Sequence, residues 1–319
     1  MLTFSLSFDP AQKEYFLGFI CKLAGIHIPQ NLFKPTMNRL NIKVDNDVTL
    51  STIVFGSLPI NFLLVHGLAS NALLWNGVGQ FLIDQGFSSN AVDLRGHGLS
   101  SKPSHGYTHE DITRDLAKVA QHVMSPESTV VLVGQSWGAS LVVDFALRYP
   151  NVAKGLVLVD GGYFDLKSRF TTWQECEERL RPPDFSGVSF ATATKFIATQ
   201  HPTWSQDAVS ATLANLEELG DHTVRARLSL TNHLAILREL YNFTPLDSIS
   251  RLTIPTRILV AKQEIDLSPD SRKEVDELRN LKHVRFDFFA NADHDLHAQM
   301  PEEVAQIALD VYEQAQVVA

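Results

Sequence analysis

The chain is poor in cysteine and in positive charge, and each shortage argues against a class of protein. Its 319 residues include only two cysteines, Cys21 and Cys176, which make neither a disulfide framework nor a zinc-ligand set. Lysine and arginine total 27 against 36 acidic residues, which gives a net charge of −9. Because nucleic-acid binding relies on basic surfaces, we expect no nucleic-acid partner. Unpaired thiols fit a reducing compartment, so we expect a cytoplasmic protein.

Long apolar runs are also missing. The apolar stretch at 15–21 is followed by Lys22 and falls well short of the ~20 residues that cross a bilayer. Asp9 and Glu14 stand where a secretory signal carries positive charge. The sequence therefore predicts no integral membrane span, and we interpret residues 1–40 as a helical N-terminal extension.

Short apolar segments alternate with segments of helical periodicity along the rest of the chain. Turn residues bound predicted strands at 60–65, 91–92, 129–133, 156–159, 257–261 and 284–289. Helices are predicted between and after them at 73–84, 110–124, 139–149, 275–281 and 302–314. Residues 41–44 and 48–55 predict an antiparallel pair that opens the fold. This alternation predicts an α/β fold with a mostly parallel, doubly wound sheet.

One interval between strands, from 160 to 256, is about four times as long as a crossover requires. Helical stretches such as 208–219 lie in it, together with the aromatic residues Trp173, Phe185, Phe190, Phe196 and Trp204. We predict a helical cap at 165–250, inserted into a core formed by 41–164 and 251–319. Such a cap would cover the carboxyl edge of the sheet, where ligands bind in α/β folds.

The motif Gly134-Gln135-Ser136-Trp137-Gly138 lies between a predicted strand and a predicted helix. This is the context that a G-x-S-x-G nucleophile turn requires. The glycines permit a sharp turn, which projects the serine hydroxyl at a helix N-terminus that favours negative charge. The alternative is a solvated serine in an ordinary tight turn. We predict that Ser136 is a nucleophile.

A serine hydroxyl needs a base and an acid that orients the base. His294 follows the last predicted strand and therefore faces the same sheet edge as Ser136, with His297 as the second choice. In the chain order serine, acid, histidine, we favour Asp266 as the acid. The alternative acids are Glu264 in the same loop and Asp160 at the end of the preceding strand.

The tetrahedral intermediate of acyl transfer needs preorganised donors. We predict the backbone N–H groups of Trp137 and Leu68 as an oxyanion hole, with His66 supporting the second loop through its ring nitrogens. The run Asp293, His294, Asp295 and His297 could also ligate a metal. It lacks an HExxH-type spacing, so no metal and no cofactor are predicted.

Several motifs resemble those of the α/β-hydrolase superfamily. Leu64-Val65-His66-Gly67 resembles its oxyanion-loop motif, and residues 91–100 resemble its DLRGHGxS stretch. Residues 134–138 match its nucleophile turn, and His294 ahead of Pro301-Glu302-Glu303-Val304 matches its histidine loop. The resemblance runs from residue 61 to the C-terminus. In the acid loop the sequence departs from the family, with Ile265 at the position of the usual aspartate.

The resemblance implies an α/β-hydrolase fold and an activity like that of cofactor-free serine carboxylesterases and lipases with a helical cap. We therefore expect a small-molecule ester substrate, cleaved through an acyl-enzyme. Similar sequences also include C–C bond hydrolases, lactonases, perhydrolases and ligand receptors with a vestigial triad, and these remain alternatives. The oligomeric state is not predicted.

Overall fold

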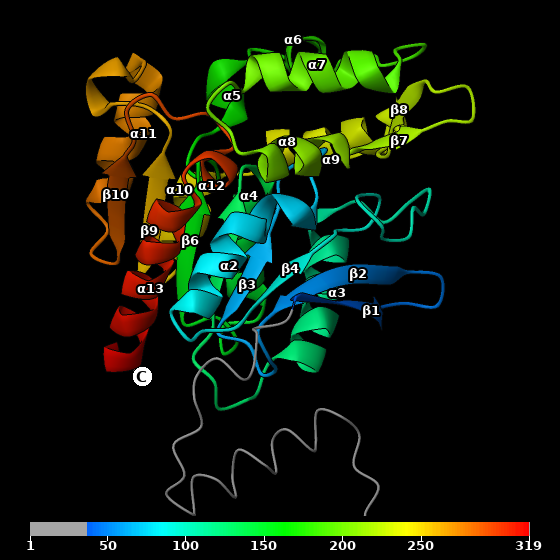
Figure 1. Cartoon of the computed structure of the whole chain (residues 1–319). Helices are drawn as coiled ribbons and strands as arrows, with labels where there is room; N and C mark the ends of the chain where they lie inside the picture. The colour runs from blue at the N-terminus through cyan, green and yellow to red at the C-terminus, as the bar shows by residue number, and fades with distance from the viewer. Residues whose placement is uncertain (1–36, 319) are drawn as a thin grey trace, which may run out of the picture. The chain divides into compact units, whose positions relative to one another are not determined.

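The computed structural model describes residues 37–318 (Figure 1). Most of the predicted N-terminal extension, including the apolar stretch at 15–21, lies outside these residues. Within them the structure has the predicted α/β-hydrolase fold, built on an eight-stranded sheet in the order β1-β2-β4-β3-β5-β6-β9-β10. The strands are β1 (Met37–Lys43), β2 (Thr49–Phe55), β3 (Phe62–Val65), β4 (Ser89–Val92), β5 (Val131–Gln135), β6 (Gly155–Val159), β9 (Thr256–Val260) and β10 (Val284–Phe288).

The sheet is antiparallel at one end and parallel elsewhere. β2 pairs antiparallel with both β1 and β4, and the remaining neighbours pair parallel. The predicted opening pair is confirmed, although its first strand begins at Met37, four residues before the predicted start. Side chains of the parallel strands are buried on both faces: Leu63 packs into one core cluster and Phe62 into another. This explains why these strands are continuously apolar rather than alternating.

Helices cover both faces of the sheet, as Figure 1 shows. The core cluster on one face includes α2 (Asn76–Asp84) and α13 (Pro301–Val318). The core cluster on the other face includes α3 (His109–Val123), α4 (Trp137–Arg148) and α11 (Pro269–Arg279). Across residues 37–318, no helix combines the length and the apolar character needed to cross a membrane.

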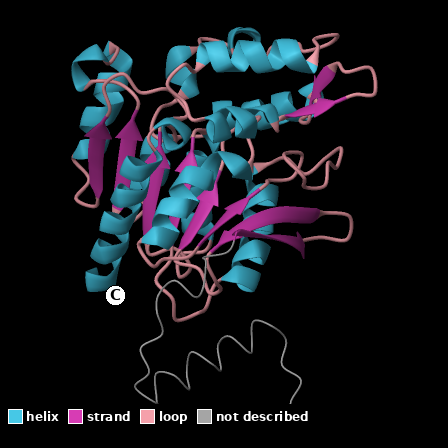
Figure 2. Ribbon diagram, in the orientation of Figure 1, coloured by secondary structure: helices cyan, strands magenta, loops and turns pink. Residues whose placement is uncertain are grey.

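A helical insertion joins β6 to β9, and we call its residues 165–250 the cap. The elements of the cap are α5 (Leu166–Arg169), α6 (Trp173–Arg179), α7 (Phe190–Gln200), α8 (Gln206–Leu213), β7 (Leu216–Glu218), β8 (Val224–Ala226), α9 (Leu230–Asn242) and α10 (Pro245–Ser250). In Figure 2 the parallel strands of the sheet point toward the helices of the cap.

The predicted helix at 208–219 is wrong in its second half. α8 ends at Leu213, and Leu216–Glu218 pairs antiparallel with Val224–Ala226. The turn between these strands explains the change, because the Asp221 carboxylate accepts a hydrogen bond from the Thr223 N–H at 3.0 Å. Such local bonds favour a turn over a continuing helix.

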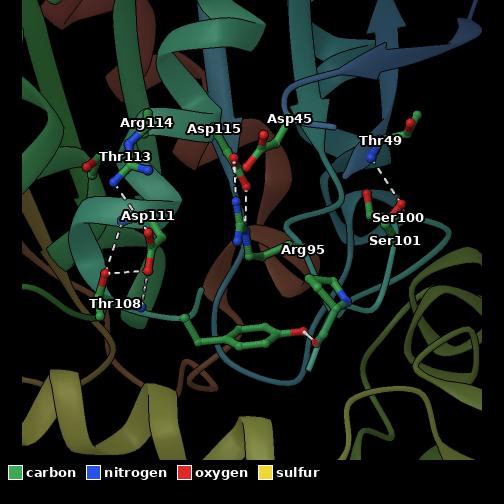
Figure 3. A network of polar contacts seen from close by, with 12 residues as sticks. Asp45, Thr49, Arg95, Ser100, Ser101, Thr108, Asp111, Thr113, Arg114 and Asp115 are labelled. Carbon is green, nitrogen blue, oxygen red and sulfur yellow. Dashed lines mark hydrogen bonds and ion pairs between the residues drawn. The ribbon is translucent and has the colours of Figure 1, made fainter. Parts of the chain in front are cut away.

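The segment after β4 is fixed by buried polar contacts. The Arg95 guanidinium binds the Asp115 carboxylate of α3 through two hydrogen bonds of 2.6 and 2.7 Å (Figure 3). The Asp93 carboxylate accepts hydrogen bonds from the Ala72 and Leu99 N–H groups at 2.8 and 3.1 Å. This segment is the DLRGHGxS stretch of the sequence, and in the structure it braces neighbouring loops.

Candidate active site

Ser136 forms the turn between β5 and α4. Its backbone adopts φ 52° and ψ −118°, a conformation that costs free energy in a non-glycine residue. Its N–H donates to the Val159 carbonyl at 2.9 Å, which ties the turn to β6. A Cβ at position 138 would lie 2.3 Å from the Val65 carbonyl oxygen, so only glycine fits there. The turn is therefore strained, closely packed and held at the carboxyl edge of the sheet.

The strand register brings an acid to the same point. Gln135 of β5 is paired with Val159 of β6, so the next residues, Ser136 and Asp160, leave neighbouring strands side by side. The Asp160 carboxylate contacts His294, with 2.7 Å between Asp160 Oδ2 and His294 Nδ1. Its other oxygen accepts the Ala261 N–H at 2.9 Å. A carboxylate only accepts hydrogen bonds, so Nδ1 carries the proton and Nε2 is free to act as a base.

The pairing differs from the sequence expectation of Asp266 as the acid. Asp266 lies in a short 3-10 helix, Glu264–Asp266, several residues beyond the end of β9, and is exposed. Glu264 in the same helix forms an ion pair with Arg279 at 3.0 Å. Asp160 is the residue that directly follows its strand, and its side chain is only 16% exposed. The geometry therefore pairs His294 with Asp160, one of the two alternatives, rather than with Asp266.

The pKa of the His294 imidazole is raised above its ordinary value. Desolvation of the ring lowers this pKa, but the hydrogen bond and the negative charge of Asp160 outweigh it. The His294 side chain is 54% exposed, so one side of the ring remains open to solvent. A paired but accessible imidazole suits proton exchange with a bound molecule.

Two backbone amides flank Ser136. Trp137 is the first residue of α4, and Leu68 follows Gly67, where a Cβ would lie 3.0 Å from Ser136 Cβ. Within residues 37–318, neither amide donates a hydrogen bond to another protein group. Both N–H groups are thus free to stabilise an anion beside the serine.

Buried histidines support the loop that carries Leu68. His66 Nδ1 lies 2.7 Å from the Gly67 carbonyl, and its Nε2 accepts the Leu94 N–H at 3.1 Å. His97 repeats this pattern, since its Nε2 accepts the Ala69 N–H at 3.2 Å. Burial lowers the pKa of His66 to about 4 and that of His97 to about 3. Both rings are therefore neutral supports, which confirms the prediction that His66 props this loop.

The glutamine inside the nucleophile motif connects the serine turn to the histidine loop. Gln135 is 1% exposed, and its Nε2 donates to the His294 carbonyl oxygen at 3.2 Å. No pattern in the sequence singles out this residue. Its place before Ser136 is the only signal, and its partner lies 159 residues away.

The other polar residues near His294 turn to separate partners. His297 is fully buried, and its ring packs against Trp75 with 4.2 Å between the centroids. Burial lowers the pKa of His297 to about 3, which does not suit a second base. Asp293 contacts the cap residues His201 and Trp204. In the part of the chain that the structure describes, no group of three or more potential ligands gathers into a metal site.

A serine on a strained strand–helix turn, beside a histidine–aspartate pair at the carboxyl edge of this sheet, defines the α/β-hydrolase class. A model of the alpha/beta hydrolase family matches residues 62–307. The chain belongs to this family.

Comparisons with individual proteins agree with this family. The 2-(acetamidomethylene)succinate hydrolase of Mesorhizobium japonicum is 36% identical over 113 residues, which cover 35% of this chain and 39% of that protein. The chain thus spans between 28% and 40% of the length of these curated relatives.

Two solved structures share the fold. That of E-2-(acetamidomethylene)succinate hydrolase has a TM-score of 0.71 and 22% identity, covering 87% of this chain and 100% of that one. An esterase of Mycobacterium tuberculosis has a TM-score of 0.67 and 20% identity, covering 97% and 100%. At this level of identity, the likeness is one of fold.

Proposed function

We propose that the protein is a serine hydrolase in which Ser136 is the nucleophile, His294 the general base and Asp160 the acid that orients it. The observation that carries this proposal is the 2.7 Å contact between Asp160 and the Nδ1 atom of His294. It lies at the sheet edge where the strained Ser136 turn leaves the neighbouring strand. Asp266, the acid favoured by the sequence, is replaced by Asp160 in this proposal.

The chemistry proceeds by acyl transfer. The Ser136 oxygen attacks the carbonyl carbon of the substrate while Nε2 of His294 takes the hydroxyl proton. The intermediate collapses as His294 returns this proton to the leaving alcohol. Water then attacks the acyl-enzyme by the same route, which releases the acid and restores Ser136. Asp160 keeps the proton on Nδ1 and stabilises the imidazolium in both halves of the reaction.

The developing negative charge is assigned to the amides of Leu68 and Trp137. Their support by His66 and by the start of α4 means that they need not reorganise when charge appears. Preorganised donors of this kind contribute about 3 kcal/mol or more each to transition-state stabilisation.

We propose carboxylic esters of small molecules as the substrate class. An ester has a leaving group that a single imidazole can protonate, and no cofactor is needed. The second candidate is an amide or a related acyl bond, favoured by the relative named for the hydrolysis of an acetamido compound. C–C bond and lactone hydrolysis, perhydrolysis and ligand reception are the remaining alternatives.

A labelling experiment tests the nucleophile. A fluorophosphonate probe should modify the wild-type protein at Ser136, and p-nitrophenyl butyrate should give a pre-steady-state burst. Both should vanish in Ser136→Ala, with turnover falling roughly 10³-fold or more because the triad acts as a unit. Ester hydrolysis that survives this substitution would contradict the proposal.

A substrate panel separates the alternatives. Esters of rising acyl length, N-acyl amides, lactones and acids with peroxide should be compared by kcat/KM, with the esters ahead if the proposal is right. Turnover below about one per minute on every compound, far under the usual enzymatic range, combined with tight ligand binding would instead favour a receptor.

A further inference from the structure

The loop that carries His294 holds a carboxylate, Asp293, for which the mechanism above has no use. Asp293 Oδ2 accepts a hydrogen bond from the Trp204 indole N–H at 2.8 Å, and it lies 3.2 Å from His201 Nδ1. Both partners belong to the cap, in the turn between α7 and α8. Because Asp293 directly precedes His294, the cap contacts the backbone neighbour of the proposed base.

The cap side of this contact is packed and largely buried. The rings of His201 and Trp204 stack with 3.9 Å between their centroids and 30° between their planes. Trp204 is 7% exposed, so its N–H has little access to water and depends on the Asp293 acceptor. Loss of the acceptor would leave a buried donor unpaired, and the cap turn would then have to shift.

Gln299, in α12 (Leu296–Gln299), also holds this loop. Its side-chain oxygen accepts the Asp293 N–H at 2.6 Å. Its amide nitrogen donates to the hydroxyl of Thr203, a cap residue, at 3.3 Å. Backbone and side chain of Asp293 are therefore both held, and the cap touches this part of the loop twice.

His294 is consequently held from two directions. From the sheet edge, Gln135 binds its carbonyl oxygen and Asp160 contacts its ring. From the cap, the restraint comes through Asp293. Reacting groups lose rate steeply when displaced, and an error of about 1 Å can cost 10²-fold.

We propose that Asp293 is a positioning residue through which the cap sets the place of the proposed base. The contact with Trp204 and His201 keeps the His294 loop in the arrangement that holds the ring on Asp160. This inference rests on the proposed function. Its consequence is that displacement of the cap slows the chemical step itself, in addition to any effect on substrate binding.

A set of variants separates this role from simple cap stability. Asp293→Ala removes the acceptor, and Trp204→Phe removes the indole N–H while keeping every charge. Asp293→Asn retains an oxygen that can accept from the indole. We expect kcat to fall roughly 10- to 100-fold for the first and about 3- to 10-fold for the second. The third should remain within about threefold of wild type.

Two esters distinguish a positioning role of Asp293 from a role limited to cap structure. p-Nitrophenyl acetate has a minimal acyl group, whereas p-nitrophenyl octanoate extends further toward the cap. A positioning role lowers kcat on both esters and slows fluorophosphonate labelling. A role limited to cap structure raises KM for the octanoate and leaves kcat for the acetate unchanged, and that result would overturn the inference.

Matched controls come from the cap itself. Phe196→Leu alters a half-exposed aromatic residue of α7, and Asp184→Asn alters an exposed carboxylate that bonds Ser186. Both should keep wild-type kcat on both esters. Thermal unfolding should show that all of the variants are folded at the assay temperature.

An NMR titration gives a readout without turnover. The His294 ring signal, identified by its loss in His294→Gln, should titrate at lower pH in Trp204→Phe because contact with Asp160 is weakened. An unchanged titration in this variant overturns the inference. If the wild-type protein takes no label and turns over no substrate, the proposed function fails, and the titration alone still decides whether the cap positions His294.

Discussion

The two sides of Ser136 are built differently. On the side of the proposed oxyanion hole (the oxyanion side), His66 and His97 are almost fully buried, neutral and bonded to backbone groups of the core. On the side of the proposed base (the base side), the His294 side chain is 54% exposed and that of Asp293 is 39% exposed. The first side is fixed as part of the folded core. The second is held by contacts that involve the cap, so under the proposed mechanism it is the side on which catalysis can be modulated.

The largest expected effect comes from Asp160, the proposed acid, which lies on the base side with the proposed base His294. Asp160→Asn keeps the shape but removes the charge and favours the wrong histidine tautomer, so kcat should drop about 10³- to 10⁴-fold. Steady-state kinetics on p-nitrophenyl butyrate would measure this drop. Asp266→Asn is the matched control and should keep wild-type kcat. The opposite pattern would restore Asp266 as the acid.

A change in the buried ion pair between Arg95 and Asp115 should affect stability rather than chemistry. Asp115→Ala leaves the Arg95 guanidinium buried without its partner; the two side chains are 4% and 7% exposed. Removal of one member of a buried pair costs about 3–5 kcal/mol of unfolding free energy. Urea unfolding measures this loss, and Arg114→Ala, a surface arginine of the same helix, serves as the control. A change below about 1 kcal/mol would show that the pair is dispensable.

Lowering the pH should affect the two sides of Ser136 differently. Burial lowers the pKa of His66 to about 4 and of His97 to about 3, whereas the unfolded chain titrates near pH ~6.5. The unfolded state therefore binds more protons between these values, and stability should be intact above about pH 6.5 and decline as the pH falls toward about 4. Urea midpoints measured across this range would test the decline.

On the base side, the contribution of His294 to stability changes with pH in the opposite direction. The raised pKa of His294 contributes stability below about pH 6.5 that is lost as the pH rises through the folded-state pKa. Catalysis needs the neutral ring, so the acidic limb of kcat/KM should have its midpoint above about pH 6.5. As the pH is lowered, activity should therefore be lost at a higher pH than the one at which the protein unfolds. An activity limb that coincides with unfolding would refute this separation.

The smallest effect is expected at the first turn of α3. Thr108 caps α3, with its hydroxyl accepting the Asp111 N–H at 3.1 Å and the Asp111 carboxylate reaching back to the Thr108 backbone N–H. Thr108→Ala should lower the unfolding free energy by about 1 kcal/mol and leave kcat unchanged. Thr108→Ser, which keeps the hydroxyl, should restore the stability. A loss of kcat would mean that α3 influences the site.

The sheet was predictable because strands that are buried on both faces appear in the sequence as short apolar runs. The serine turn and the histidine loop were predictable because each follows such a run. The proposed acid was harder to predict. Asp160 and Asp266 both satisfy the chain order of serine, acid and histidine, and only the pairing of β5 with β6 shows which one adjoins Ser136.

Contacts between distant segments could not be predicted from one sequence. Gln135 and His294 are 159 residues apart, and Trp204 and Asp293 are 89 apart. Nothing in local periodicity reports such pairs. The hairpin of β7 and β8 was missed for a related reason: its strands have three residues each, too few to reveal a period of two.

Gly161 limits how this site can diverge. A Cβ at this position would lie 2.4 Å from the Ser136 Cα, so the turn that follows Asp160 is packed directly against Ser136. Almost no mutation at 161 is compatible with the present arrangement, and Asp160 cannot move without disturbing Ser136. If the proposed function is right, we therefore expect new substrate preferences to arise most readily through changes in the cap, which makes that segment the place to direct a mutational library.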